Sequence, residues 1–363
     1  MTHPPAPEAI IRALREYSPR SLNIMEVCGT HTVSAFRSGV RSVLPEGYRL
    51  ISGPGCPVCV TSQGQIDGAV ALADVPDAIV LTYGDMLRVP GSRGSLADAR
   101  ARGRDVRVVT SAMEAPDIAL ASPGRQVVFL AAGFETTAPA TAAMLSEAAG
   151  RGLRNLSILC LHKRTPPAVR ALLEDAALGI DALILPGHVC VILGHAPFLF
   201  ISEQYERPCV IAGFSAESML LGVLDLTIQK ARGETALHSV YPDAVKSEGN
   251  RKATELMDRV FVPCDSVWRG LGKIPSSGMR LAPSLKDFDA ELRFGVSPGE
   301  PPEPRGCRCG DILRGRITPP ECPLFRTTCT PAAPVGPCMV SSEGTCGAYF
   351  RFYKGGTVAW EIS

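Results

Sequence analysis

Residues 127–161 read VVFLAAGFETTAPATAAMLSEAAGRGLRNLSILCL, and this stretch decides the predicted fold. Its two apolar runs, residues 127–131 and 156–161, are rich in the side chains that favour strands. Residues 141–149, between them, have the composition of a helix. Neither run alternates apolar with polar residues, which is typical of parallel strands covered by helices on both faces. The stretch therefore predicts a strand–helix–strand unit with parallel strands.

The same pattern continues along the chain on both sides of this unit. Further strands are predicted at residues 23–27, 49–52, 78–82, 106–110, 182–185 and 209–212, and further helices at residues 66–73 and 168–178. Alternating strands and helices predict an α/β protein with mainly parallel sheets.

A weak internal sequence repeat predicts how the chain divides into domains. The strings VCGTHTV, SGPGCPVC and TYGDML are followed later by AAGFETT, LPGHVCV and IAGFSAESML. We therefore expect two similar α/β domains, residues 1–124 and 125–245, that meet at Ser122-Pro123-Gly124. Beyond about residue 296 the chain is rich in proline, glycine and cysteine. Residues 246–363 are expected to form a C-terminal region with a loop-rich, cysteine-rich tail.

Composition limits the classes of function. With 37 basic and 36 acidic residues, the chain is not expected to bind nucleic acid or an anionic membrane surface. The beginning MTHPPAPEAI does not resemble a signal peptide, and the most apolar run, residues 189–201, is too short to span a membrane. We expect a cytoplasmic protein. In a reducing compartment its 13 cysteines indicate metal binding or redox chemistry rather than disulfides.

The tail contains six of these cysteines: Cys307, Cys309, Cys322, Cys329, Cys338 and Cys346. The spacing C-x12-C-x6-C-x16-C, in a glycine- and proline-rich backbone, predicts a 4Fe–4S cluster held by Cys309, Cys322, Cys329 and Cys346. Cys307 and Cys338 are expected to be spare. A zinc ribbon is the main alternative, but its usual pair of tight C-x2–4-C knuckles is absent from the tail sequence. Thiols without a metal are the third interpretation.

Other candidate side chains follow the early strands. Cys28, Cys56 and Asp85 each come shortly after a predicted strand, at the sheet edge where α/β proteins gather ligands. If the three strands share one sheet, these residues converge with His31 and Cys59. The C-P-V-C pair, at the expected start of a helix, predicts a first thiol acidified by the helix dipole, with Cys59 available for thiol exchange.

Several other residues allow two interpretations. His31 is either a core or capping histidine, or a proton donor or partner of a metal-bound thiolate, and His188 occupies the comparable position in LPGHVC. Glu135 and Glu343, both beside glycines, either handle protons or cap helices. Three cysteines in or beside apolar strands are expected to be buried small hydrophobic residues: Cys160, Cys190 and Cys209.

These motifs, taken together and in order, resemble the HypD family of hydrogenase maturation proteins. The resemblance rests on EVCGTHT, SGPGCPVC, LTYGDMLRVPGS, AAGFETTAP, LPGHVCVI and the tail from CRCG to VSSEGTC. It implies two similar α/β domains and a C-terminal 4Fe–4S cluster. It also implies a role in building the Fe(CN)2CO group of [NiFe]-hydrogenases, with the small chaperone HypC as partner and HypE with HypF as the source of cyanide.

The resemblance also implies roles for single residues. Cys28 looks like the thiolate that holds the iron group, with His31 beside it, and Cys56 and Cys59 look like a redox-active pair served by the cluster. Three further residues match family positions without an assigned role: Asp85, His188 and Glu343. The alternative function is a cluster-dependent thiol–disulfide oxidoreductase acting on a protein partner, and a zinc-stabilised adaptor is a third. The sequence leaves open whether the chain is an enzyme or an assembly scaffold.

Overall fold

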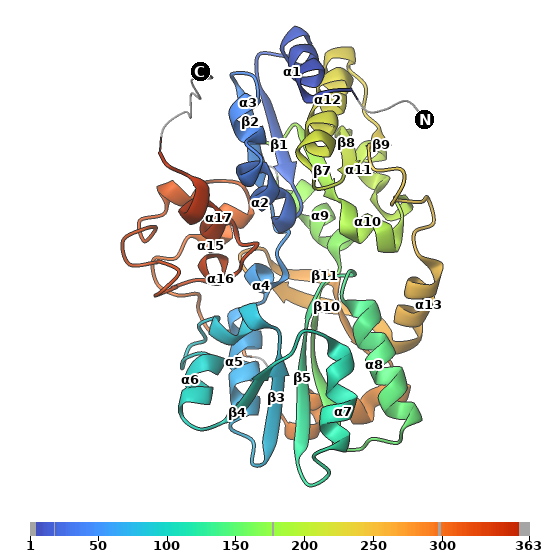
Figure 1. Ribbon diagram of the computed structural model, residues 1–363, viewed down its shortest axis with the longest axis vertical. Coiled ribbons are helices and arrows are strands. Elements are labelled where there is room, and N and C mark those ends of the chain that lie inside the picture. The colour runs from blue at the N-terminus through green and yellow to red at the C-terminus, as the bar shows by residue number, and fades with distance from the viewer. Residues whose placement is uncertain (1–4, 18, 176–177, 297–298, 356–363) are drawn as a thin grey trace.

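The computed structural model describes residues 5–17, 19–175, 178–296 and 299–355. It is an α/β structure with two parallel sheets, one above the other along the long axis of the molecule, and a cysteine-rich C-terminal tail beside them (Figure 1). The predicted fold class is therefore confirmed.

The first sheet has five parallel strands in the order β2-β1-β7-β8-β9. They are β1 (Leu22–Glu26), β2 (Tyr48–Ser52), β7 (Ala182–Pro186), β8 (Cys209–Ala212) and β9 (Leu237–Ser239). Ile24 faces a core shared with α1 (Pro7–Glu16) and α12 (Ala216–Arg232), whereas the next residue, Met25, belongs to the core on the other face. Both faces are covered, which explains why these strands do not alternate in polarity.

The second sheet has four parallel strands in the order β4-β3-β5-β6. They are β3 (Ala78–Thr82), β4 (Asp105–Val108), β5 (Gln126–Gly133) and β6 (Leu156–His162). Val80 packs with α5 (Gln63–Ala73) and α6 (Leu96–Ala101), and its neighbours Ile79 and Leu81 pack with α7 (Ala115–Leu120) and α8 (Ala138–Gly150).

The eight predicted strands are all present, to within two residues at either end. The helix predicted at residues 168–178 is α9 (Thr165–Leu173), which ends earlier than expected; residues 176–177 lie outside the described residues. The sequence did not reveal β9 or the antiparallel hairpin of β10 (Phe261–Trp268) and β11 (Gly272–Leu281).

The predicted division at residue 124 is wrong. The chain leaves the first sheet after β2, builds the whole second sheet, and returns at β7 (Figure 1). Met25 of β1 pairs with Leu183 of β7, and Val80 of β3 pairs with Val128 of β5. A run of strand–helix–strand units has the same pattern whichever sheet each strand joins, so the sequence pattern does not fix the pairing.

The predicted C-terminal region, residues 246–363, is also not one unit. Helix α13 (Arg251–Val260) and the β10–β11 hairpin contribute Met257, Phe261 and Met279 to a core of the second sheet, and α14 (Ala290–Phe294) follows them. Within the described residues after 299, the tail contains only short helical segments: α15 (Cys309–Leu313), η5 (Pro319–Glu321), α16 (Pro337–Val340) and α17 (Thr345–Phe352).

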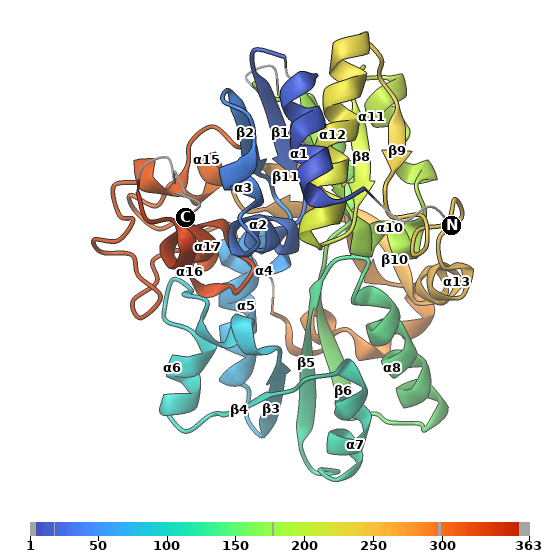
Figure 2. The same cartoon turned by 45° about the horizontal axis from the view of Figure 1, so that its top comes forward.

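The tail packs where the two sheets meet. Helix α17 lies against α2 (Gly29–Arg37), and α16 lies against α4 (Pro57–Val60), which stands between the sheets (Figures 1 and 2). The remaining helical segments are α3 (Val40–Val43), α10 (Gly187–Leu193), α11 (Phe200–Glu203), η1 (Gly84–Arg88), η2 (Ala112–Glu114), η3 (Ala196–Phe198) and η4 (Pro283–Phe288). None of the helices in the described ranges has the length and apolar character needed to cross a membrane.

Candidate functional site

Three glycine-containing segments meet between the sheets and bring the candidate residues together. A side-chain carbon at Gly55 would lie 2.3 Å from the Cα of Cys28, and one at Gly29 would lie 2.5 Å from the carbonyl oxygen of Glu343. One at Gly344 would lie 2.2 Å from the carbonyl oxygen of Cys338. Only glycine permits such close backbone contact. The CGTH, GPGC and SEGTC strings therefore pack against one another.

Cys28 lies at the N-terminus of α2, directly after β1. Its thiol is buried, and burial together with the nearby Glu343 carboxylate raises its pKa to about 11, although donors from His31 and Thr30 lower it. The Thr30 hydroxyl donates to Glu343 Oε1 at 2.6 Å. Without a metal the thiol is protonated at neutral pH, and a cation that binds there must displace the proton.

His31 is a buried, neutral histidine. Its Nε2 lies 3.2 Å from the carbonyl oxygen of Ala212 and 3.0 Å from that of Gly213, so Nε2 carries the hydrogen. Burial lowers its pKa to about 4. Its Nδ1 is buried and has no hydrogen-bond partner among the described residues. Of the two interpretations, the structure favours a core histidine, with one acceptor atom left open.

His188 lies at the same sheet edge, at the start of α10 after β7. The ring of Phe214, which follows β8, stacks on His31 at 4.6 Å and on His188 at 3.9 Å between ring centres. Burial lowers the pKa of the His188 imidazole, and the Glu343 carboxylate opposes this shift. The structure therefore brings His31, His188 and Glu343 together around Cys28, and Phe214 links the two histidines.

The C-P-V-C pair forms the start of the four-residue helix α4. The Cys59 amide donates to Cys56 Sγ at 3.3 Å, and Cys56 Sγ donates to Ser341 Oγ at 3.3 Å. Burial and the neighbouring Cys59 raise the pKa of Cys56. Burial also opposes ionisation of Cys59, but hydrogen bonds from Cys338 and Cys56 outweigh it and lower its pKa. The prediction that the first thiol is the acidic one is therefore wrong, because the pKa of Cys56 is raised whereas that of Cys59 is lowered.

Asp85 follows β3, which belongs to the second sheet, so the assumption that the three early strands share one sheet is wrong. Its carboxylate nevertheless reaches the site through the tail. Asp85 Oδ2 accepts from Ser341 Oγ at 3.1 Å, from the Ser342 amide at 2.9 Å and from the Ser342 hydroxyl at 3.0 Å. Since Ser341 also bonds Cys56, this serine joins the edges of the two sheets. Sequence reasoning missed it, although it lies in the VSSEGTC string.

All six tail cysteines line one small cavity, whose other walls are mainly apolar: Ile312, Leu324, Phe325 and Met339, with Gly336. Cys309 Sγ and Cys338 Sγ lie 3.0 Å apart, and the Val335 amide donates to Cys329 Sγ at 3.3 Å. No three His, Cys, Asp or Glu side chains in the described part of the chain are arranged around a single metal ion. A set of thiols spread around an apolar cavity fits a cluster better than one ion, because a cluster distributes its ligands over several irons.

Cys338 connects this cavity to the dithiol. It is buried, its sulfur lies 3.0 Å from Cys309 Sγ, and it also interacts with the thiols of Cys346 and Cys59. The sequence marked Cys338 as a spare tail cysteine, but the structure places it between two groups of thiols. The choice of Cys309, Cys322, Cys329 and Cys346 as cluster ligands stays a prediction.

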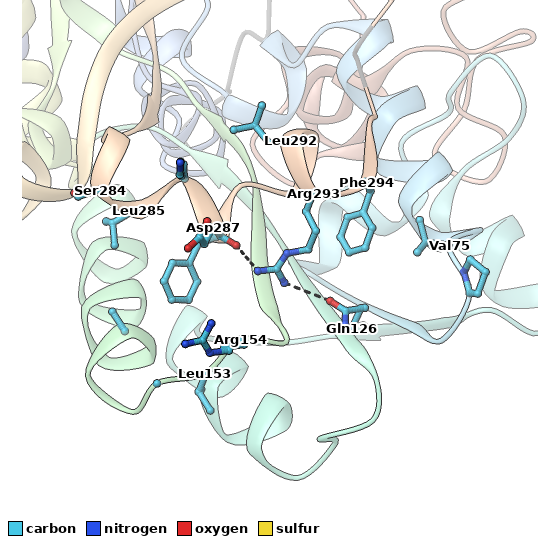
Figure 3. Close-up of a pocket in the computed structure, with 15 residues that line it drawn as sticks. Val75, Gln126, Leu153, Arg154, Ser284, Leu285, Asp287, Leu292, Arg293 and Phe294 are labelled. Carbon is cyan, nitrogen blue, oxygen red and sulfur yellow. Dashed lines mark hydrogen bonds between the residues drawn. The ribbon is translucent and has the colours of Figure 1, made fainter.

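The remaining candidates have structural partners. Glu135 is buried and accepts from the Thr165 amide at 2.7 Å and the Thr165 hydroxyl at 2.8 Å, so it caps α9. Cys190 and Cys209 are buried as predicted, whereas Cys160 is only partly buried. The large open hollow of Figure 3 lies elsewhere, beside α14 at the start of β5, and no candidate residue lines it.

Comparison with known proteins identifies the family of the chain. The family model described as HypD, "Hydrogenase formation hypA family", matches residues 6–353. The hydrogenase maturation factor HypD of Escherichia coli is 45% identical over 334 residues, which cover 92% of this chain and 90% of that protein. HypD2 of Bradyrhizobium diazoefficiens is 44% identical over 353 residues, covering 94% and 93%. The chain therefore belongs to the HypD family of hydrogenase maturation factors.

Proposed function

We propose that this chain holds an iron ion at Cys28 while the Fe(CN)2CO group of a [NiFe]-hydrogenase is assembled on it, and then passes the group on. The observation that carries the proposal is the position of Cys28 beside a continuous set of thiols between the two sheets. A soft thiolate suits an iron centre that takes up cyanide and carbon monoxide.

The residues around Cys28 have roles that follow from their contacts. Donors from His31 and Thr30 stabilise the thiolate once iron displaces its proton. Glu343 is held by Thr30 and adds negative charge that favours a bound cation. The open Nδ1 of His31 is an acceptor that can orient a donor in the bound group.

One protein thiolate leaves most of the iron's coordination positions open. We therefore propose that a HypC-like small chaperone supplies a second ligand, and that cyanide comes from a HypE-like partner working with HypF. Such partners approach Cys28 from the exposed side of the site, where His188 lies.

The tail cavity fits a 4Fe–4S cluster held by cysteine thiolates, and such a cluster supplies electrons one at a time. Cys56 and Cys59 store electrons in pairs: their disulfide takes up two electrons and two protons to become two thiols. Cys59 is the more acidic thiol and contacts Cys338, so it is the thiol placed to exchange. An external one-electron reductant must supply both electrons.

A thiol–disulfide oxidoreductase acting on a protein partner is the second candidate, and the contact of Cys59 with Cys338 favours it. Burial argues against it: Cys56 is 3% exposed and Cys59 is not exposed at all, so a partner's disulfide does not reach either sulfur without movement of the tail.

Infrared spectroscopy separates the two candidates. The chain is purified without oxygen together with its HypC-like chaperone. We expect bands in the cyanide and carbonyl stretching regions, with iron and sulfide present in the tail. Absence of these bands, combined with rapid reduction of protein disulfides, would establish the oxidoreductase. Zinc in place of iron and sulfide would establish a zinc-stabilised adaptor.

A further inference from the structure

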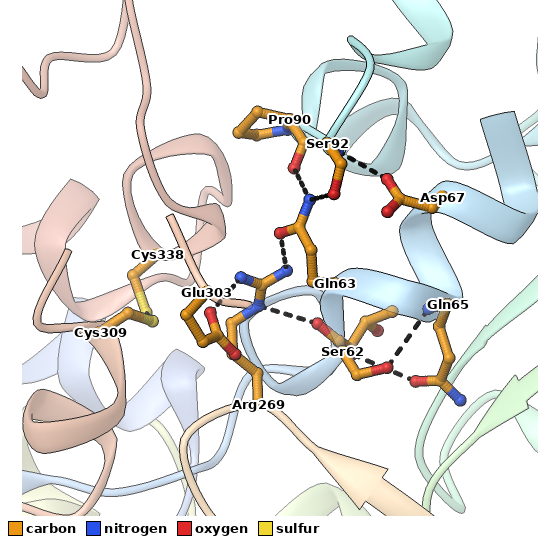
Figure 4. A network of polar contacts seen from close by, with 11 residues as sticks. Ser62, Gln63, Gln65, Asp67, Pro90, Ser92, Arg269, Glu303, Cys309 and Cys338 are labelled. Atoms are coloured by element: carbon orange, nitrogen blue, oxygen red, sulfur yellow. Dashed lines mark hydrogen bonds and ion pairs between the residues drawn. The ribbon is translucent and has the colours of Figure 1, made fainter. Parts of the chain in front are cut away.

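Arg269 is a buried cation at the tip of the β10–β11 hairpin, and it contacts the chain on both sides of the thiol site (Figure 4). Its Nε donates to the carbonyl oxygen of Thr61 at 3.0 Å and its Nη2 to Gln63 Oε1 at 3.0 Å. Its backbone amide donates to the carbonyl oxygen of Val60 at 2.9 Å. Three contacts, to Val60, Thr61 and Gln63, thus hold the segment directly after Cys59.

The remaining guanidinium nitrogen reaches the segment that leads into the tail. Arg269 Nη1 lies 2.6 Å from Glu303 Oε2, shortly before Cys307. The next residue, Gly270, touches Gly310, which follows Cys309: a side-chain carbon at Gly270 would lie 2.3 Å from the Cα of Gly310. The hairpin tip therefore sits against both the dithiol segment and the first loop of the cysteine-lined cavity.

The dithiol segment needs such external support. Helix α4 has only four residues, too few to hold a fixed position by its own hydrogen bonds. The beginning of α5, which follows α4, is also held by Lys163, whose Nζ donates to Gln65 Oε1 at 2.8 Å. Gln63 is fixed in turn, since its Nε2 reaches the carbonyl oxygen of Pro90 at 3.4 Å.

The contacts of Arg269 fit a role in holding neighbouring segments in position better than a role in stabilising the fold. Burying a guanidinium is costly unless charge and hydrogen bonds compensate for lost water. Here the carboxylate partner, Glu303, is 47% exposed, and the other partners are neutral oxygens. A planar fork with several donors holds both segments at set angles to the hairpin, with a fixed geometry that a lysine amine on a flexible stem lacks.

We propose that Arg269 is a positioning residue that holds the Cys56–Cys59 dithiol in contact with Cys338 at the edge of the tail cavity. The inference rests on the proposed redox role of this dithiol. Removing the fork leaves α4 free to shift relative to α16, against which it packs, and this separates Cys59 from Cys338. The dithiol then becomes a different redox couple while the fold persists.

The test measures the exchange constant of the dithiol with glutathione in the full-length protein. In this exchange, the dithiol and one glutathione disulfide give the protein disulfide and two glutathione thiols. Alkylation followed by mass spectrometry of the peptide containing Cys56 and Cys59 gives the oxidised fraction. For Arg269→Gln we expect the constant to change by threefold to tenfold, and tenfold corresponds to about 30 mV in potential.

Trp268→Phe is the matched control. Trp268 is buried in the same hairpin, its Nε1 donates to Ser277 Oγ at 2.9 Å, and its ring stacks on Phe134, so phenylalanine keeps an aromatic ring there and removes only a hydrogen bond made within the hairpin. We expect it to lower the melting temperature without changing the exchange constant. If Arg269→Gln behaves in the same way, with the constant within twofold of the wild type, the proposal is overturned.

Arg269→Lys separates geometry from charge. The proposal expects this variant to resemble Arg269→Gln, because lysine keeps the charge but not the fork. Full recovery of the wild-type constant would show that charge acts instead, which also overturns the proposal. Because the dithiol is buried, the exchange is followed to equilibrium. Failure of the proposed function is then distinguishable, because it appears in the wild type itself as a dithiol that stays reduced at equilibrium with excess glutathione disulfide.

Discussion

The carboxyl edges of the two parallel sheets both carry polar residues, but the two sets differ in what surrounds them. At the edge of the second sheet, Lys163 Nζ donates to Gln65 Oε1, Ser266 Oγ and the carbonyl oxygen of Val267, all within 2.8 Å. Asp85 and Glu135 likewise have several partners each (see above). At the edge of the first sheet, His31 Nδ1 has no partner among the described residues, and it lies in the same helix turn as Cys28 and near exposed His188. His162 Nδ1 at the second edge also lacks a partner there, but its ring is buried against Phe261 and bonded to Thr141.

The difference shows how residues that could act on a ligand can be told apart from residues that only hold the fold in place. Both edges are places where α/β proteins collect ligands. Groups such as Lys163 and Glu135 hold elements together through the hydrogen bonds that they already make. Cys28 and His31 keep an open thiol and an open acceptor atom, next to exposed His188. We therefore infer that the first edge carries the chemistry and the second edge holds it in place.

The largest expected effect tests the first edge. Cys28→Ala removes the proposed iron ligand, and hydrogenase maturation is expected to fall by more than about 100-fold, beyond the loss typical of residues that only orient a ligand. The iron and sulfide of the tail are expected to stay. Metal analysis of the purified variant and hydrogenase activity in a complemented strain measure the two effects.

Cys209→Ala is the control for this variant. Cys209 lies in β8 of the same sheet, is fully buried, and donates only to the carbonyl oxygen of Ala236. Its loss is expected to lower stability by about 1–2 kcal/mol and to leave maturation intact. If Cys28→Ala also loses the tail iron, the separation between the iron site and the cluster site is wrong.

The second prediction concerns how Lys163, at the edge of the second sheet, makes the free energy of unfolding depend on pH. Burial lowers the pKa of Lys163 to about 7, from a usual value of 10.5. Between these values the unfolded chain binds one more proton than the folded chain, so the free energy of unfolding rises with pH, by at most about 1.4 kcal/mol per pH unit. Below pH 7 both states are protonated and this contribution is constant.

Lys163→Met removes this contribution. Denaturant unfolding at pH 7.0 and 8.5 is expected to show a smaller gain in stability for the variant than for the wild type, by about 1–2 kcal/mol. Buried thiols such as Cys28 act in the opposite direction, but mainly above pH 9, because burial raises their pKa. Equal gains in the two proteins would mean that Lys163 is not a buried, neutralised amine.

The elements could be predicted from the sequence much better than their arrangement. Apolar runs such as residues 78–82 and 209–212 mark strands because burial on both faces requires them. The pairing of β3 with β5, rather than with β1, depends on contacts between distant residues that no local pattern records. The β10–β11 hairpin was missed because Pro263, Pro275 and several glycines interrupt its strand pattern.

For the candidate site, the sequence predicted the chemistry but not the connections. Cys28, Cys56, Cys59 and Glu343 were identified from their motifs, and the structure brings them together. The links between them come from Ser341, Cys338 and Arg269, whose residue types carry no signal until their neighbours in space are known. The acidic thiol was misassigned for the same reason, since Cys338, which acts on Cys59, is distant from it in the sequence.

The smallest expected effect tests whether Asp85 supports the site or takes part in its chemistry. Asp85→Asn keeps one carbonyl acceptor but loses the charge that strengthens the bonds to Ser341 and Ser342, so we expect about 1 kcal/mol less stability. Asp117→Asn is the control, because Asp117 pairs with Arg151 on the surface and its loss should be almost neutral. Thermal unfolding measures both. If Asp85→Asn instead abolishes maturation while the melting temperature and the tail iron are unchanged, Asp85 belongs with Cys28, and the second edge contributes chemistry as well as support.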